Sequence, residues 1–527
     1  MLVCFDIMIQ SCQILGFTFI LVLLVLVFSL QKSLRKKKIK KLPDKLARKH
    51  YLIFWAAILF VGVLPRLINL TMFYQNDEGY YMYVAKKFFE GCSLYNTLLF
   101  GHPPLYPIAT AHVFKFLGVG LFQAKLVPVT LSILTLPLLF MTVKRFWGVK
   151  EAMLSTLIWS FNPLIMIDAG NPGMYAELVF FSLASAILLL VGLEEEGKLK
   201  IFFAGFFAGL AASYRMFGLY LIFVGIVYLC LRDRKQVLPY LMGLLLVVAP
   251  LFIHYFNSSP ETFSYMLFGY HESKNILGLS FLEKLGSFVK NFTIYPMFFI
   301  FPILALLNRK EGFGKVKDAT TFFFMWFTGI ILLPFLPVHK AFLINNYSIF
   351  FLPPLAILSG RFVEFLNEKY ARVLITCIII INISMICFTF LINFENYSTI
   401  GNVKKYVEHN TRQQDTITGD LTPMIYFIGG RDLTSQRFNM TPNTLMKLSE
   451  GADGGKCETE CEIISEKIIS TSAYVLVSER EDNAEKMKTQ LERLDCIAEK
   501  KIGDVILYTC GQNTVTLINS DFSQLQL

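Results

Sequence analysis

Residues 201–231 read IFFAGFFAGLAASYRMFGLYLIFVGIVYLCL, an apolar block that is interrupted once, at Ser213-Tyr214-Arg215. A helix crosses a bilayer with about 20 apolar residues, so the block is too long for one comfortable span. The interruption therefore predicts two short membrane helices that fold back at Arg215.

The rest of the chain repeats this apolar pattern. Further runs lie near 13–31, 51–70, 121–143, 151–168, 173–193, 236–256, 288–307, 319–337, 346–359 and 373–394. The composition agrees, because 54% of the residues are hydrophobic and 17% are charged, whereas soluble domains carry roughly a quarter charged residues. This excludes an ordinary soluble enzyme, and we predict a polytopic α-helical membrane protein with about twelve transmembrane helices.

Basic residues gather between the apolar runs and predict the orientation of the chain. The clusters are Lys32–Lys49, Lys144–Lys150, Lys198–Lys200, Arg232–Lys235, Arg309–Lys317 and Arg361–Arg372. With twelve spans they all fall on one side, which the positive-inside rule makes cytoplasmic. The formal charge of +10 therefore orients a membrane protein, and we expect no nucleic-acid partner. Because the final Leu-Gln-Leu is no retention signal, we expect the plasma membrane.

Three regions follow from this topology. Residues 1–50 hold a retained N-terminal helix and a basic loop, since no positive residue precedes the run 13–31 as it would in a signal peptide. Residues 51–395 form the membrane region, with an outer loop at 71–120. Residues 396–527 lie outside the membrane.

The tail after Phe394 is polar and punctuated by glycines. Alternating patterns predict strands at 416–418, 424–428, 474–477 and 505–508, and helical patterns occur at 400–410 and 482–494. We therefore predict a small C-terminal extracytoplasmic α/β domain.

The tail also holds four cysteines, Cys457, Cys461, Cys496 and Cys510. An even number in an oxidising compartment predicts two disulfides, with three connectivities open. A zinc site at Cys457 and Cys461 has less support because no histidine lies nearby, and free or mixed thiols are the other alternative.

The outer loop carries the most informative polar stretch, Asn76-Asp77-Glu78-Gly79-Tyr80-Tyr81. An amphipathic helix over about 79–90 is too short to cross the membrane and would lie on its surface. Asp77 and Glu78 would then sit where a lipid-linked substrate places its polar head. The alternative is structural: Asn76 or Asp77 caps the helix and Glu78 favours its dipole.

A second pair of acids follows in the next outer turn. Glu177 falls just inside the start of an apolar helix, where an acid is costly unless it faces water or a partner, so we favour a functional role. For Asp168 we favour helix capping.

Basic groups occur on the same predicted outer face. Arg215 suits a phosphate because its guanidinium binds oxyanions in a fork geometry, although an interfacial arginine without a ligand is the alternative. His339 and Lys340 precede Tyr347, and Lys340 is a second candidate for phosphate, while an aromatic belt explains Tyr347 equally well. Acids and bases around one cavity suit an inverting sugar transfer, with a carboxylate as base and cations beside the departing phosphate.

The order of these motifs resembles the GT-C glycosyltransferases, and in particular the dolichyl-phosphate-mannose protein mannosyltransferase and aminoarabinose transferase family. The resemblance rests on Asp77-Glu78-Gly79-Tyr80-Tyr81 with Gly91, His102-Pro103-Pro104-Leu105-Tyr106, Arg145-Phe146-Trp147-Gly148, Met174-Tyr175-Ala176-Glu177, His339-Lys340, Phe351–Leu355 and, weakly, Tyr406–Asp420. It covers most of the chain.

The resemblance implies a polyprenyl- or dolichyl-phosphate sugar donor, membrane lipid around the site, and inversion at the anomeric carbon. Asp77 would be the catalytic base, Glu78 would assist or position it, and Glu177 would be the second acid with Asp168 in reserve. The implied substrate-binding residues are Tyr80, Tyr81, His102, Asp168, Arg215, His339, Lys340 and Tyr347. Relatives often have Arg-Tyr where this chain has Asn346-Tyr347, so Lys340 would substitute toward phosphate.

Some points stay open at this stage. Some relatives use a divalent metal and others do not, so no metal is assigned, and neither the sugar nor the acceptor follows from the residues. One alternative is a transporter or lipid flippase, against which the sequence shows no convincing internal repeat. A further alternative is a non-catalytic glycan-binding relative, which a substitution of Asp77 would distinguish.

Overall fold

The computed structural model describes 58–70, 76–160, 170–269, 316–332 and 349–362, with some single residues between them and short stretches of the tail. Its residues divide into two compact units. The first unit comprises Met1–Leu70, Leu126–Phe252 and Leu279–Phe390; the second comprises Thr71–Lys125, Ile253–Gly278 and Leu391–Leu527. We describe each by itself. The expected regions 1–50, 51–395 and 396–527 remain a prediction.

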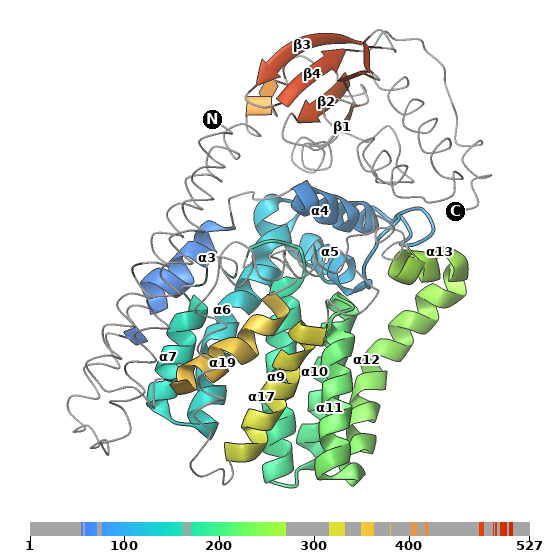
Figure 1. Cartoon of the computed structure of the whole chain (residues 1–527). Coiled ribbons are helices and arrows are strands. Elements are labelled where there is room, and N and C mark those ends of the chain that lie inside the picture. Colours follow the sequence, from blue (N-terminus) through green and yellow to red (C-terminus); the bar gives the residue numbers. More distant parts are fainter. Residues whose placement is uncertain are drawn as a thin grey trace. The chain divides into compact units, whose positions relative to one another are not determined.

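Three consecutive helices form the centre of the first unit. Helices α9 (Tyr175–Glu194), α10 (Lys198–Tyr214) and α11 (Gly218–Arg232) lie side by side (Figure 1). The predicted break of the block 201–231 is confirmed, because α10 ends at Tyr214 and Arg215 adopts an extended backbone. Glycine is required where the chain resumes, since a Cβ at Gly218 would lie 2.4 Å from the nitrogen of Ala212.

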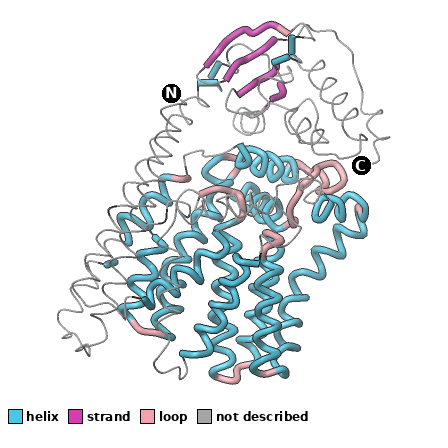
Figure 2. The backbone as a smooth tube through the Cα atoms, in the orientation of Figure 1, coloured by secondary structure: helices cyan, strands magenta, loops and turns pink. Residues whose placement is uncertain are grey.

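Further apolar helices complete this picture, and helices dominate the part of the chain that is coloured in Figure 2. They are η1 (Ile58–Val63), α3 (Leu64–Ile68), α6 (Leu121–Phe146), α7 (Val149–Ser160), η2 (Arg234–Gln236), α12 (Val237–Ser258), α17 (Val316–Leu332), η6 (Ile349–Phe351) and α19 (Leu352–Phe362). Among the described residues, three segments are long and apolar enough to span a membrane: Leu121–Phe146, Tyr175–Glu194 and Arg234–Ser258. The chain is thus a multi-pass membrane protein.

The number of spans stays a prediction. The runs 13–31 and 288–307 lie outside the described residues, as does nearly all of 373–394. The described parts of the runs 151–168 and 319–337 include helices α7 and α17.

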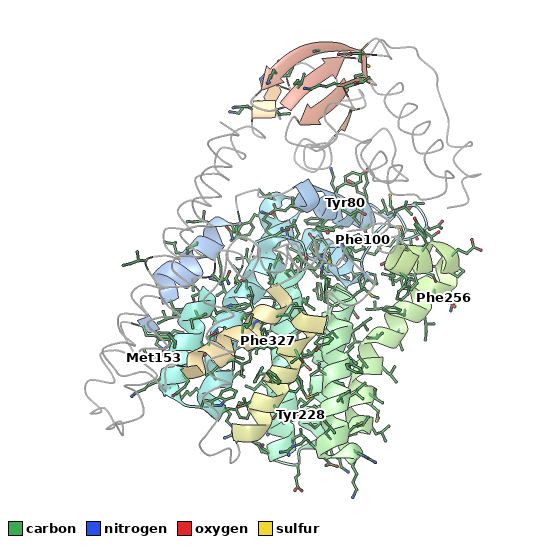
Figure 3. All side chains as sticks on the ribbon, viewed as in Figure 1. Tyr80, Phe100, Met153, Tyr228, Phe256 and Phe327 are labelled. Atoms are coloured by element: carbon green, nitrogen blue, oxygen red, sulfur yellow. The ribbon has the colours of Figure 1, made fainter. Side chains whose placement is uncertain are left out.

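Aromatic side chains fill the core of the first unit. The rings of Trp326 and Phe350 lie 5.5 Å apart, and those of Tyr228 and Phe322 lie 5.3 Å apart. Figure 3 labels Tyr228 and Phe327 in this region. These contacts join α11, α17 and η6.

The second unit holds two packed helices, α4 (Asn76–Phe89) and α5 (Leu105–Leu117), followed along the chain by α13 (Pro260–Ser264) and η3 (Tyr265–Gly269). The expected surface helix at 79–90 is present as α4, but it begins at Asn76, so Asn76 and Asp77 lie in its first turn instead of capping it. Helix α5 was not anticipated. It begins directly after Pro104, and a proline is a common signal for the start of a helix.

Four strands of the tail form one sheet in the order β1-β2-β4-β3. They are β1 (Ile417–Gly419), β2 (Tyr474–Ser478), β3 (Ile497–Ile502) and β4 (Val505–Thr509). Strand β1 pairs parallel to β2, and the other pairs are antiparallel. Three strands lie where alternation predicted them, whereas 424–428 is outside the described residues. Strand β3, with the sequence IAEKKI, was not predicted because its three charged residues interrupt the alternation of apolar and polar residues. The α/β domain as a whole remains a prediction.

One tail cysteine supports the disulfide prediction. Cys496 is disulfide-bonded, and Cys457, Cys461 and Cys510 lie outside the described residues. The two cysteines found free in the described part of the chain, Cys92 and Cys230, are not tail residues.

Candidate active site

The first group of candidate residues lies on helix α4. The helix places Asp77 and Glu78 in its first turn, where the helix dipole favours negative charge. The side chain of Asp77 is outside the described residues. Glu78 is fully buried, and its Oε2 lies 2.9 Å from the ammonium nitrogen of Lys125, which is also fully buried.

This ion pair gives Glu78 a structural role. A buried carboxylate is costly without a partner, and close pairing compensates part of that cost. Lys125, at the start of α6, therefore holds the first turn of α4 in place. The sequence analysis missed Lys125, although a lysine one turn inside an apolar run is itself a signal of a functional or paired charge.

Hydrogen bonds tie α4 to the turn that contains His102. The hydroxyl of Tyr81 lies 3.0 Å from Nε2 of His102, and the hydroxyl of Tyr95 donates to the carbonyl of His102 at 2.6 Å. Tyr80 donates to the carbonyl of Leu99 at 2.7 Å. Three of the candidate substrate-binding residues, Tyr80, Tyr81 and His102, are thus brought together with Glu78.

Burial of Tyr95 fixes the position of its ring and also changes the pKa of its hydroxyl group. Its ring packs against Phe263 at 4.8 Å and Tyr255 at 5.2 Å. Burial, with a smaller contribution from Tyr255, raises the pKa of Tyr95 well above its ordinary value. The phenol therefore stays protonated, as its hydrogen bond to His102 requires.

The second group lies in the first unit, around the start of α9. Glu177 is fully buried, and no other described residue forms a hydrogen bond with its carboxylate oxygens. Arg215 is also buried, and its guanidinium carbon lies 4.0 Å from the centre of the Tyr175 ring. The charges of Glu177 and Arg215 interact, so the structure brings these two predicted residues together.

The loop before α9 holds Arg215 in position. Nη1 of Arg215 donates to the carbonyl of Gly173, and the amide of Gly173 donates to Oδ1 of the buried Asn171 at 2.9 Å. Met174 then adopts a left-handed backbone with φ of 66°. The strained turn and the buried amide fix the loop against the guanidinium. The sequence analysis did not single out Asn171.

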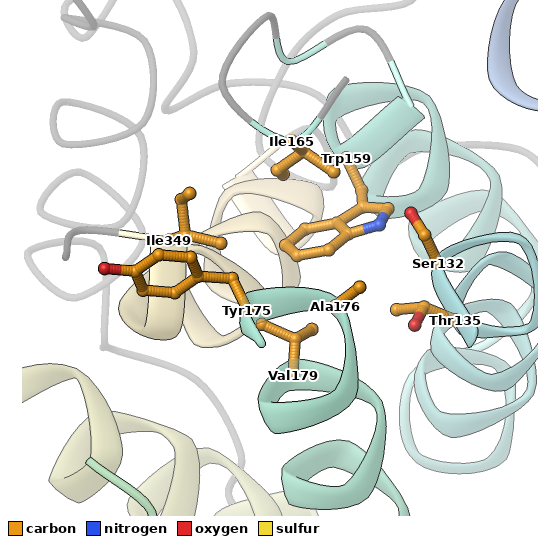
Figure 4. Close-up of a pocket in the computed structure, with 8 residues that line it drawn as sticks. All are labelled: Ser132, Thr135, Trp159, Ile165, Tyr175, Ala176, Val179 and Ile349. Atoms are coloured by element: carbon orange, nitrogen blue, oxygen red, sulfur yellow. The ribbon is translucent and has the colours of Figure 1, made fainter. Parts of the chain in front are cut away.

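A small pocket adjoins this group (Figure 4). It is lined by Ser132, Thr135, Trp159, Ile165, Tyr175, Ala176, Val179 and Ile349. Its free space is about 10 Å³, enough for roughly one water molecule. On one side Tyr175 contacts Arg215, and on the other Ser132 accepts a hydrogen bond from Nε of the buried Arg66 at 3.0 Å. Arg66 was also missed, although it stands at the end of a predicted span.

Four candidate residues cannot be placed: Asp168, His339, Lys340 and Tyr347 lie outside the described residues. The described candidates form two groups, one in each unit. Within the described part of the chain, no three His, Cys, Asp or Glu side chains are close enough to hold a metal ion. We derive no step through a metal.

Comparisons with known proteins identify the fold. Residues 101–255 match the family described as dolichyl-phosphate-mannose-protein mannosyltransferase. The structure is similar to that of ArnT from Cupriavidus metallidurans bound to undecaprenyl phosphate, with a TM-score of 0.62 and 14% identity over 89% of this chain and 99% of that one. The apo form of ArnT gives a TM-score of 0.59 and 15% identity over 88% and 98% of the two chains.

A more distant likeness extends the same fold. The structure is also similar to that of archaeal oligosaccharyltransferase AglB from Archaeoglobus fulgidus in complex with an inhibitory peptide and a dolichol-phosphate. The TM-score is 0.53, and the identity is 11% over 89% of this chain and 75% of that one. No curated protein sequence matches the chain significantly. The class defined by these comparisons is the GT-C glycosyltransferase fold. The family match covers residues 101–255, and the likeness to ArnT shows a shared fold over most of the chain. Both agree with the resemblance to the protein mannosyltransferase and aminoarabinose transferase family that the sequence shows.

Proposed function

We propose that the chain moves a sugar from a polyprenyl- or dolichyl-phosphate donor to a hydroxyl group of a protein, lipid or glycan, with inversion at the anomeric carbon. The reaction would take place on the extracytoplasmic face of the plasma membrane. The observation that carries the proposal is the burial of Arg215 beside Glu177 at the start of α9. A guanidinium held inside apolar helices suits a phosphate at membrane level.

The comparisons support the donor class. Two similar structures, those of ArnT and AglB, are complexes with undecaprenyl phosphate and dolichol-phosphate, respectively. The disulfide at Cys496 supports an oxidising, extracytoplasmic compartment for the tail.

The proposed reaction assigns a role to each residue group. The carboxylate of Asp77 takes the proton of the acceptor hydroxyl, whose oxygen forms a bond to the anomeric carbon. The bond from that carbon to the carrier phosphate breaks, and its electron pair leaves with the phosphate. Arg215 stabilises the departing phosphate. Attack on the face opposite the leaving group gives inversion.

The remaining residues position the substrate or the turn that carries Asp77. Glu177 can accept hydrogen bonds from sugar hydroxyls, because its carboxylate oxygens lack partners. Glu78 and Lys125 hold the turn that carries Asp77. Tyr80, Tyr81 and His102 shape the loop beside it, and the roles of Asp168, His339, Lys340 and Tyr347 stay as the resemblance implies.

The test uses the full chain in nanodiscs with a panel of radiolabelled polyprenyl-phosphate sugars and a membrane extract as acceptor. We expect turnover with at least one donor, and a loss of about 10²–10⁴-fold in Asp77→Asn, the range for a general base. Glu90→Gln is the matched control, since Glu90 follows the far end of α4, where its exposed carboxylate pairs with Lys87. Turnover that survives Asp77→Asn would refute the assignment of the base.

The same assay separates the alternatives. A flippase would move the labelled lipid between leaflets without releasing sugar, and a glycan-binding relative would do neither. Donor-dependent product from the wild type would exclude both.

A further inference from the structure

A second pocket lies in the first unit, where α9 and α11 end, away from the helix starts near Glu177 and Arg215. Its volume is about 340 Å³, within the range of about 300–1,000 Å³ for small-molecule sites. The lining residues are Phe146, Leu190, Leu193, Glu194, Glu196, Tyr228, Arg232, Asp233, Gln236 and Ala319. None of them belongs to the candidate active site.

Gln236 provides the first sign of a ligand. Its side chain lines the pocket and is 5% exposed, and its Oε1 atom is buried without a hydrogen-bond partner. Buried polar atoms in native proteins are nearly always satisfied. A ligand that donates a hydrogen bond inside the pocket would satisfy this oxygen.

The charges of the lining predict the sign of the ligand. Three carboxylates, from Glu194, Glu196 and Asp233, face one guanidinium, from Arg232. Glu194 is already paired, since its Oε2 lies 3.0 Å from Nη2 of Arg145. Glu196 and Asp233 remain to favour a cationic group near Gln236.

An ammonium fits these acceptors better than a metal ion does. Among the described residues no three His, Cys, Asp or Glu side chains converge closely enough for a metal. An ammonium carries three separate N–H donors, so it can reach acceptors that stand apart. The guanidinium of Arg232, which is hydrogen-bonded to Tyr228, is the group that would bind an anion such as phosphate.

The surroundings of the pocket place it next to lipid. Leu231 and Leu238 flank its polar residues in the sequence and are 71% and 66% exposed, as expected for side chains that face a bilayer. Phe146, Leu190, Leu193 and Ala319 give the pocket an apolar side. A matching ligand has an ammonium for the acceptors near Gln236, a phosphate for Arg232 and an apolar part for the apolar side of the pocket.

We propose that this pocket binds the phosphoethanolamine headgroup of a membrane phospholipid. The ammonium donates to Oε1 of Gln236 and to the carboxylates of Glu196 and Asp233, and the phosphate pairs with Arg232. The site is separate from the proposed sugar transfer and does not depend on it.

Native mass spectrometry of the full chain in detergent tests this binding. The protein is titrated with phosphatidylethanolamine, phosphatidylcholine and phosphatidylglycerol of identical acyl chains, and with free phosphoethanolamine. We expect phosphatidylethanolamine to bind at least about tenfold more tightly than phosphatidylcholine, because the choline nitrogen has no hydrogen to donate. Equal binding of these two lipids would overturn the proposal. Equally tight binding of free phosphoethanolamine would overturn the assignment to a lipid.

Variants locate the site. The double variant Glu196→Gln with Asp233→Asn removes both carboxylates, while an asparagine can still cap η2 as Asp233 does through its bond from the amide of Lys235. We expect the double variant to bind phosphatidylethanolamine about tenfold or more weakly, so that its preference over phosphatidylcholine is lost. Gln236→Met should do the same without unfolding the chain, since it removes an unsatisfied acceptor.

Glu195→Gln is the matched control. Glu195 stands between Glu194 and Glu196, pairs with Lys200 and does not line the pocket. It should retain the full preference. A preference that is unchanged in both the double variant and Gln236→Met would show that the lipid binds elsewhere and refute the proposal.

Discussion

The ammonium nitrogen of Lys125 lies 2.9 Å from Oε2 of Glu78, and both side chains are fully buried. The pair joins the start of α6 to the first turn of α4, directly beside Asp77 in the sequence. Glu78 therefore serves to position the turn, and the proposed chemistry falls to its neighbour.

Removing one member of this pair should destabilise the protein strongly. Lys125→Met removes the ammonium that pairs with the buried Glu78 carboxylate, and breaking a buried ion pair in this way costs about 3–5 kcal/mol. We expect a clear fall in the Tm of the purified chain, and a partial recovery when Glu78→Gln is added. Lys115→Met, an exposed lysine on α5, is the control. A Tm for Lys125→Met equal to that of Lys115→Met would contradict the structural role.

Glu177 should show the opposite balance between stability and activity. No other described residue forms a hydrogen bond with its buried carboxylate oxygens, and Arg215 keeps its bond to the carbonyl of Gly173. The isosteric Glu177→Gln should therefore lower the Tm much less than Lys125→Met does. If Glu177 contacts the donor, turnover should fall about 10²-fold or more. Both quantities are measured on one preparation, with the exposed Glu261→Gln as control. Normal turnover would remove Glu177 from the site.

Sequence reasoning was most successful where one residue interrupts a strong pattern. Arg215 inside an apolar block predicted the turn between α10 and α11, because a buried charge is unfavourable in the middle of a span. The surface helix α4 was predicted from the amphipathic pattern over about 79–90. In both places the local sequence carries the physical cause of the structure.

The missed features depend on residues that are distant in the sequence. Lys125 pairs with Glu78, 47 residues away, and Arg66 donates a hydrogen bond to Ser132, 66 residues away. Strand β3 forms because β4 pairs with it, although its own residues are largely charged or small. A local sequence pattern does not encode partners that are distant in the sequence, so these interactions become visible only in the three-dimensional structure.

Arg215 should not tolerate replacement by lysine. Its guanidinium stacks on Tyr175 at 4.0 Å and donates to the carbonyl of Gly173, and a lysine cannot do both while facing a phosphate. We expect Arg215→Lys to lower kcat/KM for the lipid donor about 10²–10³-fold, the range for the loss of one electrostatic contact in the transition state. Arg145→Lys, on an exposed surface pair with Glu194, should keep normal kinetics. Equal kinetics of the two variants would exclude a phosphate contact at Arg215.

The packing of α10 against α12 leads to the last prediction. A Cβ at Gly205 would lie 1.8 Å from the carbonyl oxygen of Tyr240, and a Cβ at Gly243 would lie 1.9 Å from that of Phe202. Small residues of this kind let membrane helices approach closely. Gly205→Ala must therefore push the helices apart, at a cost of about 1–3 kcal/mol.

The measurement is the Tm of the purified chain in detergent. Gly197→Ala is the control, because a Cβ there meets only the Lys200 side chain at 3.6 Å. We expect Gly205→Ala to unfold at a clearly lower temperature than Gly197→Ala. Since Gly205 lies on the same helix that ends at Arg215, the variant should also lose donor turnover through displacement of that end. A Tm equal to that of the control would show that the two helices are not held at this contact distance.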